Sequence, residues 1–530
     1  MKKISVWFKK NWVLITIIII FLLLNNLNYL AGFLFSVKST DLIYGGAPTT
    51  NIGDYNVYLS YIQQGWQGHL FMKILYNPAS RYLLFSPIWF LIGQFNRLTD
   101  LNIIFSYHLF RALLSLVFIG VLYWWLKKIF NQKWLRLSAL AFILFSNGFG
   151  LFFLNILHHY QLSPSNQWIP ESITFLNLNQ GPLFIISQAL LLLVFSLFIK
   201  AWQERRPRLL FWACLANLFL GLNHPYDLVT IMCILLIFTT WEYLEKRQIK
   251  IIFYYAALGI STLLAGAYLL YLLKDPSMQQ YQAQNILLSK NIWEYIFGFG
   301  ALTVLSLLGI FYVLKQKLYI NPHIKLLAIW ALCGWVLVYL PLDFNRRLSN
   351  GWHIALAAIS FLAIIQISKK INFYWRLIFL GFIMSVCLFD TLGHIINDVI
   401  ITRDIARRPL FFFSQARMKN YQFIKKINTE HDVFLSRNND AGLLPAFTGC
   451  TVYMGNSILT PNASQKNAQI ANLWASRQDI GDWLKDNKIT YIFASRDYIP
   501  EFEQIKWLAD QPYIEPVIDN DSFLLYKVRS

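Results

Sequence analysis

Long apolar runs, separated by short polar segments, fill residues 1–390 of the chain. Several runs reach the ~20 apolar residues that a helix needs to cross a bilayer. The first run follows a basic start, as in a signal peptide, but its apolar stretch is too long and no small-residue cleavage site follows. We therefore expect a retained anchor. The pattern predicts about eleven membrane spans, at 11–35, 103–126, 137–157, 181–200, 209–222, 228–244, 251–273, 293–314, 326–341, 352–368 and 373–390.

The first two predicted spans are separated by a long segment, 36–102. Within it, residues 82–95 are apolar but short and contain Pro87, which favours a re-entrant or interfacial helix over a further span. Another helix is predicted from Asp54 onward. Its apolar, aromatic stripe, suited to lying flat on the bilayer surface, consists of Tyr55, Tyr58, Leu59, Ile62 and Trp66.

The last part of the chain, 391–530, has a different pattern. The stretches "DVFLS", "TVYMG", "TYIFA" and "SFLLYKV" predict strands, and the regions 464–487 and 500–510 predict helices between them. The sequence "DND" at 519–521 indicates a hairpin turn. We expect a separate α/β domain here, beside a transmembrane domain that spans 1–390.

Composition agrees with a membrane protein, because 56% of the residues are hydrophobic and only 14% are charged. The net charge of +19 resembles that of a nucleic-acid-binding protein, but the position of the basic residues along the chain argues against this interpretation. Residues 391–530 hold 16 Lys and Arg against 15 Asp and Glu, so the excess lies in the membrane part. We therefore expect no nucleic-acid partner.

The basic residues also predict the orientation of the chain. With the N-terminus inside, the inner segments carry 21 Lys and Arg, and the outer segments, although longer in total, carry 8. This asymmetry follows the positive-inside rule. An odd number of spans then places the C-terminal domain outside the cell. The cysteines predict neither a metal site nor a disulfide framework, since four lie in apolar spans and Cys450 stands alone.

Several ionisable residues at the outer ends of the spans are candidates for chemistry. Asp54 stands at a predicted helix start, where it could cap the helix, act as a catalytic acid or base, or do both. Arg346 and Arg347 occupy a short outer loop and could anchor lipid headgroups or clamp a phosphate. Arg111 falls inside the second span, where it is either functional or reaches out to the headgroups.

Two further segments carry candidate binding residues. "NHPYD" joins two short spans and would turn His224, Tyr226 and Asp227 toward an outer cavity, although Asp227 could merely cap the next helix. Glu171 is the only acid of the loop 158–180 and follows Pro170, so it is either a favourable charge at a helix start or a second active-site carboxylate.

Four stretches, "GDYNVYLSYIQQGWQG", "NHPYD", "FNRRLSNGWHIALA" and "LLPAFTGCTVYMGN", together with an acid in the first outer loop, resemble the GT-C superfamily of membrane glycosyltransferases, in a bacterial mannosyltransferase-like branch. The resemblance implies a polytopic enzyme that takes a sugar from a polyprenyl phosphate. It implies a catalytic role for Asp54 and donor-phosphate contacts for the arginines. Tyr58 and His353, which lie in the matching stretches, become candidate substrate contacts.

Together these features predict a GT-C-like protein of the bacterial cell membrane with an extracytoplasmic α/β domain. We expect transfer of one sugar to an extracytoplasmic glycan, lipid or protein acceptor, inverting, with no metal or cofactor, because arginines could stabilise the phosphate and no D-x-D or E-x-D is present in the first loop. The alternatives are a lipid or sugar transporter or flippase, and a non-catalytic envelope protein whose tail binds glycan.

Overall fold

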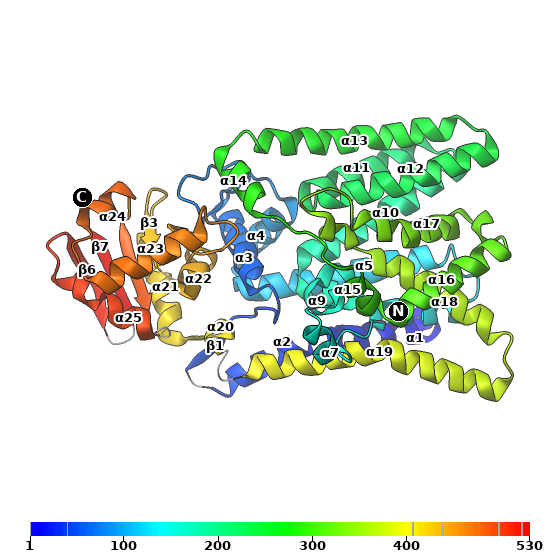
Figure 1. Cartoon of the computed structure of the whole chain (residues 1–530), viewed down its shortest axis with the longest axis horizontal. Helices are drawn as coiled ribbons and strands as arrows, with labels where there is room; N and C mark the ends of the chain where they lie inside the picture. Colours follow the sequence, from blue (N-terminus) through cyan, green and yellow to red (C-terminus); the bar gives the residue numbers. More distant parts are fainter. Residues whose placement is uncertain are drawn as a thin grey trace. The chain divides into compact units, whose positions relative to one another are not determined.

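The computed structural model divides the chain into two compact units. It describes residues 2–39, 41–404, 408–436, 438–496, 499–520 and 523–529. We call residues 1–28, 109–269 and 287–398 the helical unit, and residues 29–108, 270–286 and 399–530 the mixed unit (Figure 1).

The helical unit is built almost entirely of apolar helices. Its long helices are α1 (Lys2–Asn25), α5 (Ile103–Leu126), α10 (Pro182–Glu204), α11 (Pro207–Asn223), α12 (Tyr226–Lys246), α13 (Lys250–Leu272), α16 (Ala301–Lys315), α17 (Pro322–Leu337), α18 (Trp352–Ser368) and α19 (Phe373–Arg403). Shorter helices are α6 (Lys133–Phe145), α7 (Leu154–His159), α8 (Ser165–Trp168), α9 (Thr174–Gln180) and α15 (Ile292–Phe299), with the 3₁₀ turns η1 (Pro170–Ser172), η2 (Leu318–Ile320) and η3 (Asn345–Ser349).

Six helices in the described residues are long and apolar enough to cross a membrane. Two bent pairs raise this to eight: α1 from Lys9 with α2 (Leu27–Val37), bent by 57°, and α15 with α16, bent by 85°. The multi-pass architecture is therefore confirmed. The figure of eleven spans stays a prediction, since α6, α11 and α17 are apolar but have only 13, 17 and 16 residues.

The predicted span 137–157 is not one continuous helix. Helix α6 ends at Phe145, and Ser146 is already in extended backbone. The following chain finds its hydrogen-bond partners elsewhere, because Asn147 N–H donates to Cys387 O at 2.8 Å and Phe149 N–H to Phe297 O at 2.9 Å. Backbone that leaves the helix at membrane depth must be paired within the protein in this way.

The last long helix, α19, continues to Arg403, past the end predicted at 390. The predicted span ended at Asp390, whose carboxylate is costly in a membrane interior. In the structure Asp390 is fully buried and accepts hydrogen bonds from Leu151 N–H at 2.9 Å and from Asn166 Nδ2 at 2.8 Å. These bonds compensate for the lost hydration of the carboxylate.

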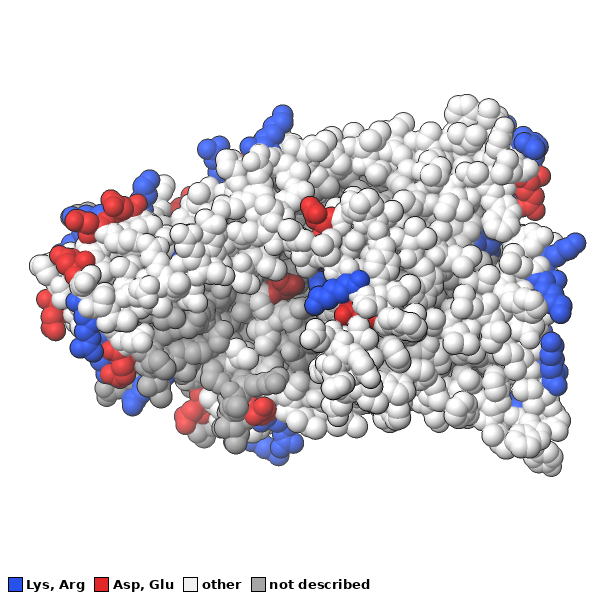
Figure 2. Space-filling view, viewed as in Figure 1, with Lys and Arg blue, Asp and Glu red and all other residues white. Residues whose placement is uncertain are grey.

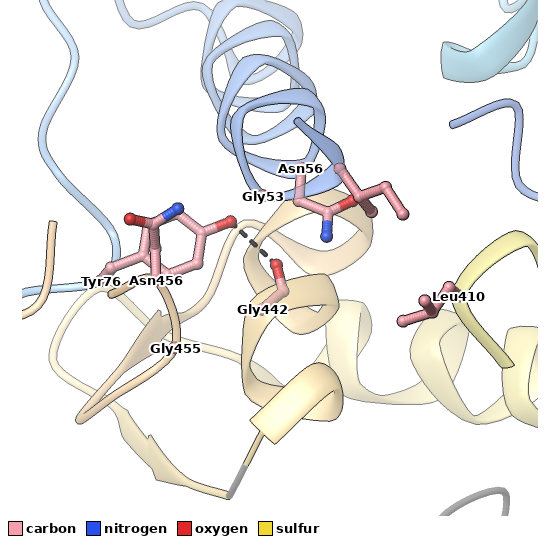
Figure 3. Close-up of a pocket in the computed structure, with 8 residues that line it drawn as sticks. Gly53, Asn56, Tyr76, Leu410, Gly442, Gly455 and Asn456 are labelled. Atoms are coloured by element: carbon pink, nitrogen blue, oxygen red, sulfur yellow. Dashed lines mark hydrogen bonds between the residues drawn. The ribbon is translucent and has the colours of Figure 1, made fainter. Parts of the chain in front are cut away.

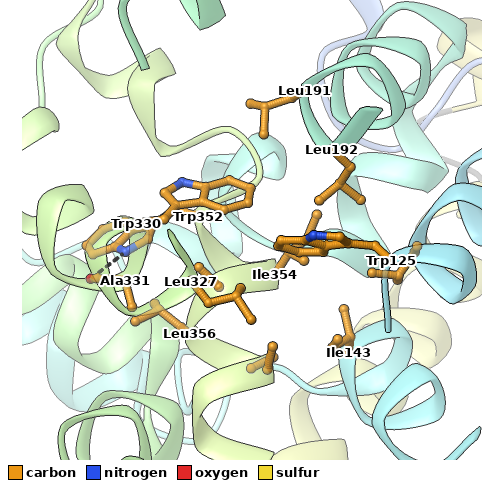
Figure 4. Close-up of a cluster of buried hydrophobic side chains, with 14 of the residues drawn as sticks. Trp125, Ile143, Leu191, Leu192, Leu327, Trp330, Ala331, Trp352, Ile354 and Leu356 are labelled. Carbon is orange, nitrogen blue, oxygen red and sulfur yellow. Dashed lines mark hydrogen bonds between the residues drawn. The ribbon is translucent and has the colours of Figure 1, made fainter. Parts of the chain in front are cut away.

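Large side chains from many helices form one continuous core in the helical unit. Figure 4 shows Trp125, Trp330 and Trp352 interleaved with leucines and isoleucines, and the Trp352 indole N–H donates to Ala331 O at 3.0 Å. In Figure 2, Lys and Arg gather at the end of this unit where α12 passes to α13 and α18 to α19, and most of the remaining surface of the unit is uncharged apart from a few charged side chains near the middle of the view.

The mixed unit contains a five-stranded sheet in the order β4-β3-β5-β7-β6. Its strands are β3 (Val433–Leu435), β4 (Thr451–Val452), β5 (Tyr491–Ser495), β6 (Ile514–Asn520) and β7 (Phe523–Val528), of which β3, β4 and β5 are parallel and β7 is antiparallel to β5 and β6. All four predicted strands are present. Strand β6 was not predicted, since it lies at an edge, is mostly exposed and contains Pro516. Asp521, the last residue of the predicted turn, lies outside the described residues.

Helices surround this sheet and extend the mixed unit. They are α3 (Ile52–Gln67), α4 (Pro87–Thr99), α14 (Pro276–Gln284), α20 (Arg408–Phe411), α21 (Gln415–Ile427), α22 (Asn438–Thr448), α23 (Ala463–Ser476), α24 (Gly481–Asp486) and α25 (Ile499–Ile505), followed by η6 (Lys506–Asp510). Strand β1 (Leu42–Tyr44) pairs antiparallel with β2 (Phe412–Ser414). This pair links the long segment after the first span to the early part of the segment 391–530.

Candidate functional site

Asp54 lies in the first turn of α3, and it is half-buried. The helix begins at Ile52, and Asn51 takes the capping position with a left-handed φ of 57°, a conformation that asparagine tolerates. The capping role considered for Asp54 is therefore wrong: the residue stands inside the helix, where a carboxylate still gains from the positive end of the dipole. Burial raises the pKa of Tyr61, two turns further on, and the charge of Asp54 raises it again.

Helix α3 is packed within protein rather than lying on a bilayer surface. Of the predicted stripe, Tyr55, Leu59 and Ile62 are buried inside the mixed unit. Tyr58 is half-buried and stacks on Trp89 of α4, with ring centroids 4.6 Å apart. The surface role predicted for this stripe is wrong, because the same side chains fill the contacts of α3 with its protein neighbours.

Two glycines set the position of α3. A Cβ added to Gly93 of α4 would lie 2.6 Å from the carbonyl carbon of Gly65 and 2.7 Å from Ile62 O, both in the backbone of α3. The two helices therefore cross at backbone contact, which only glycine allows. This contact fixes the helix that carries Asp54 against α4.

A small polar pocket opens beside the first turn of α3, with a volume of about 130 Å³. Gly53 and Asn56 line it from α3, Gly442 from α22, and Gly455 and Asn456 from the loop after β4 (Figure 3). Tyr76 forms another wall and donates a hydrogen bond from its hydroxyl to Gly442 O at 2.9 Å. The remaining lining residues, Ile52 and Leu410, are apolar. None of these described lining residues is charged.

The helical unit contains a second group of candidate residues, formed around Arg347. Its guanidinium Nη1 lies 3.5 Å from Glu171 Oε1, and the guanidinium carbon is 5.0 Å from the centre of the Tyr226 ring. Glu171 is only 4% exposed. Neighbouring Arg346 lies over the Trp168 ring at 4.6 Å. The structure thus brings together predicted residues that are far apart in sequence, and it places Glu171 in η1 directly after Pro170, as expected.

Asp227 is buried next to this group, in the first turn of α12. Asn350 donates from Nδ2 to both of its carboxylate oxygens, at 3.1 and 2.9 Å, and His224 Nδ1 lies 3.0 Å from Oδ2. These partners compensate the buried carboxylate for the water that it loses. The helix-capping role considered for Asp227 therefore describes it incompletely, since its oxygens are directed at a side-chain network.

Asn350 is the centre of that network, and it was not predicted. Its Oδ1 accepts from Asn177 at 2.9 Å and from Gln188 at 3.2 Å, and its Nδ2 also donates to Ser187 at 2.6 Å. The sequence gives only a weak signal for this network, namely amide side chains in otherwise apolar segments. Such amides need hydrogen-bond partners when they are buried. These amides connect Asp227 to α9 and α10.

Arg111 and His353 have partners within the helical unit. Arg111 is 1% exposed and donates to Asn179 O at 3.2 Å and Leu178 O at 3.5 Å, and it also pairs with Asn26. It therefore does not reach out to lipid headgroups. His353 is fully buried in α18, with Nδ1 2.9 Å from Thr174 Oγ1. Arg111 thus links the end of α9 to α5, and His353 links the start of α9 to α18.

Comparison with known proteins identifies the fold. No family model matches the chain, and no curated protein sequence matches it. Among solved structures, ArnT from Cupriavidus metallidurans bound to undecaprenyl phosphate aligns over 95% of this chain and 97% of its own, with 12% identity and a TM-score of 0.50. The mycobacterial arabinofuranosyltransferase AftD aligns over 96% of this chain and 40% of its own, with 12% identity and a TM-score of 0.54. The chain therefore has the fold of these two membrane proteins, in agreement with the GT-C fold that the sequence resemblance implied.

Proposed function

We propose that this protein transfers a sugar from a polyprenyl phosphate to an acceptor at the outer face of a bacterial cell membrane. The observation that supports it most directly is the GT-C fold of a chain whose Asp54 is half-buried in the first turn of α3. The polar pocket next to that turn is lined by its neighbours Gly53 and Asn56 rather than by Asp54 itself. A membrane enzyme of this kind would keep the prenyl tail in lipid while the sugar reacts in water.

In the proposed step Asp54 is the general base. The acceptor oxygen bonds to the anomeric carbon as the bond from that carbon to the phosphate oxygen breaks. The electron pair leaves with the phosphate, and the acceptor proton passes to the Asp54 carboxylate. Attack opposite the leaving phosphate inverts the anomeric centre.

The leaving phosphate needs positive charge, and we assign this role to Arg346 and Arg347. Both guanidiniums lie over aromatic rings, which help to hold them in place. We assign Glu171 to positioning Arg347, because it lies 3.5 Å from that guanidinium. Arg111 is assigned a positioning role as well, since backbone carbonyls already accept from it.

The test of Asp54 is transfer by purified protein in lipid nanodiscs, with a radiolabelled polyprenyl-phosphate sugar. We expect Asp54→Asn to lose at least about 10²-fold in turnover, the usual contribution of a general base, while its melting temperature stays unchanged. Asp100→Asn, an exposed acid at the end of α4, is the matched control and keeps full turnover. Full turnover in Asp54→Asn would exclude this carboxylate as the base.

The test of the arginines separates binding from chemistry. Arg346→Gln and Arg347→Gln are expected to raise KM for the lipid donor and lower kcat, without changing KM for the acceptor. The control is Arg206→Gln, whose side chain is exposed and pairs with Glu204. Unchanged donor kinetics in both variants would contradict the phosphate assignment. We also expect turnover to survive treatment with a metal chelator, because guanidiniums stabilise the charge on the leaving phosphate in this proposal.

A second candidate function is movement of a lipid-linked sugar across the bilayer. The two helix pairs bent by 57° and 85° favour it, since broken helices occur at the binding sites of transporters. Substrate-dependent uptake into vesicles that contain the Asp54→Asn variant, with no transfer product from the wild type, would favour this function over the first.

A further inference from the structure

The two arginines assigned to the phosphate lie on η3, a 3₁₀ turn of five residues. Within this turn, Arg347 N–H donates to Phe344 O at 2.9 Å, and Ser349 Oγ donates to Arg346 O at 2.8 Å. A 3₁₀ turn this short makes few hydrogen bonds of its own, and their geometry is poorer than in an α-helix. The position of the two guanidiniums therefore depends on what holds the ends of the turn.

The exit of the turn is held by Asn350, which is fully buried. Its N–H donates to Arg347 O at 3.1 Å, so its backbone continues the turn. Its side chain is bound by three helices, through hydrogen bonds to Asp227 of α12, Asn177 of α9, and Ser187 and Gln188 of α10. Movement of this amide would break several buried hydrogen bonds, each of which is costly to lose.

The first turn of α12 contacts η3 at two points. Asp227 accepts from Asn350 with both carboxylate oxygens, and the ring of the preceding residue, Tyr226, lies 5.0 Å from the guanidinium carbon of Arg347. Tyr226 also packs on Phe344, with ring centroids 4.9 Å apart. One end of α12 thus holds both the anchor of the turn and one of its two guanidiniums.

The entry of the turn is held by a separate segment. Leu287 N–H donates to Asp343 O at 2.6 Å, and Arg346 N–H donates to Leu287 O at 3.2 Å. Asn345 Oδ1 accepts from Ser289 N–H at 2.8 Å. Because both ends of the turn are bound to protein, a ligand of the arginines would not have to order the turn when it binds.

We propose that Asp227 and Asn350 are positioning residues for the phosphate of the lipid donor, which act by holding the turn that carries Arg346 and Arg347. The inference rests on the phosphate role that is proposed for these arginines. Asp227 and Asn350 are both 0% exposed, so neither offers a surface to a lipid headgroup. Asp227, a candidate substrate contact in the sequence, would then serve the substrate indirectly.

The experiment measures the Kd of undecaprenyl phosphate, a polyprenyl phosphate without a sugar, for the full chain in nanodiscs. Asn350→Asp places two carboxyl groups face to face and removes the amide donor between them. Asp227→Asn is milder, because its amide keeps one oxygen that can accept. The exchanged pair, Asp227→Asn with Asn350→Asp, again sets an amide donor against a carboxylate. The control is Asn217→Asp, a fully buried amide of α11 that donates to the Ser261 and Thr262 hydroxyls of α13.

We expect the Kd to rise about tenfold in Asn350→Asp and by less in Asp227→Asn, since a small displacement of the guanidiniums weakens their contacts with phosphate. The exchanged pair and Asn217→Asp should bind nearly as the wild type does. Asn350→Asp and Asn217→Asp should both melt at lower temperature, because each buries a carboxyl group in place of an amide. Similar losses of stability with unequal losses of binding would separate positioning from a structural role.

A second comparison tests whether Asn350 acts through the arginines. In a protein that already carries Arg346→Gln and Arg347→Gln, the addition of Asn350→Asp should raise the Kd no further, since no guanidinium remains to be displaced. A full tenfold rise in that background would overturn the proposal. An unchanged Kd in Asn350→Asp despite a lower melting temperature, or no recovery of binding in the exchanged pair, would overturn it as well.

The results also separate this inference from the proposed function. Unchanged binding in Asn350→Asp, with weaker binding in the arginine variants and sugar transfer by the wild type, would reject the positioning role and retain the transferase. The expected pattern of binding in a protein that transfers no sugar would retain the positioning role and reject the transferase. No binding to the wild type would reject the phosphate site and, with it, the positioning role.

Discussion

Replacing Gly93 by alanine tests whether the contact between α3 and α4 sets the position of Asp54. The added Cβ would lie 2.6 Å from the carbonyl carbon of Gly65 and 2.7 Å from its Cα. Ordinary contact between carbon atoms begins near 3.5 Å. The helices must therefore separate by about 1 Å, because the clashing atoms belong to the backbone and cannot rotate away.

Two terms contribute to the stability of Gly93→Ala. Overpacking a tight contact costs about 1–3 kcal/mol, and exchanging glycine for alanine inside a helix contributes up to ~1 kcal/mol of stability. Gly120→Ala in α5 isolates the second term, since an added Cβ there meets nothing within 4 Å. The difference between the two variants therefore measures the overpacking term alone.

The assay is the apparent melting temperature at one scan rate, together with transfer of the labelled sugar. We expect Gly93→Ala to melt several degrees below Gly120→Ala and to lose about 10²-fold in turnover, since a shift of 1 Å in a catalytic group can cost that much. Equal melting temperatures and equal turnover in the two variants would refute the reasoning that backbone contact positions α3.

Three further predictions concern charged groups. Arg347→Gln should destabilise the protein by about 3–5 kcal/mol, because it leaves the buried Glu171 without its ion pair, and Glu171→Gln in addition should restore part of the loss in denaturant unfolding. Arg111→Lys should melt below the wild type, since an ammonium cannot reproduce the fork whose Nη1 donates to two backbone carbonyls and whose Nη2 donates to Asn26 Oδ1. Burial lowers the pKa of Lys466 to about 8, so acetic anhydride should label it half-maximally near pH 8, well below the pH needed for an ordinary lysine, as mass spectrometry can test. Because this pKa is lower than in the unfolded chain, the lysine's contribution to folding stability rises with pH between about 8 and 10.5.

Much of the fold could be predicted because it follows from local patterns. Apolar runs located the long helices, and alternation located the strands β3, β4, β5 and β7. The break after Phe145 was missed because the residues on both sides are apolar, so hydropathy continues across it. The signal was the stretch "SNGFG" that follows, whose Asn147 and Gly148 disfavour helix.

The candidate site could be predicted only in part. Single residues such as Asp54 and Glu171 stand out in sequence because an acid is costly near a membrane. The residues that contact such acids in the folded protein do not stand out in the sequence. Arg347 contacts Glu171, and Asn350 contacts Asp227, through folding that brings distant helices together. No local pattern carries that information, and amides such as Asn350 are too common to be noticed singly.

The group around Arg347 and the pocket beside the first turn of α3 differ in the chemistry that they can perform. This difference supports separate roles for the two. The group around Arg347 combines guanidiniums, aromatic rings and buried carboxylates, which suits a phosphate that gains charge as its bond breaks. The described residues that line the pocket beside the first turn of α3 are uncharged, which suits a ligand that carries hydroxyl groups. Positive charge near the acceptor hydroxyl would hinder Asp54 as the proposed base. A neighbouring cation would stabilise the ionised carboxylate and weaken its affinity for the proton. A lysine placed at Gly53 should therefore lower the pKa of the base in the pH profile of kcat/KM, whereas glutamine at that position should leave the profile in place.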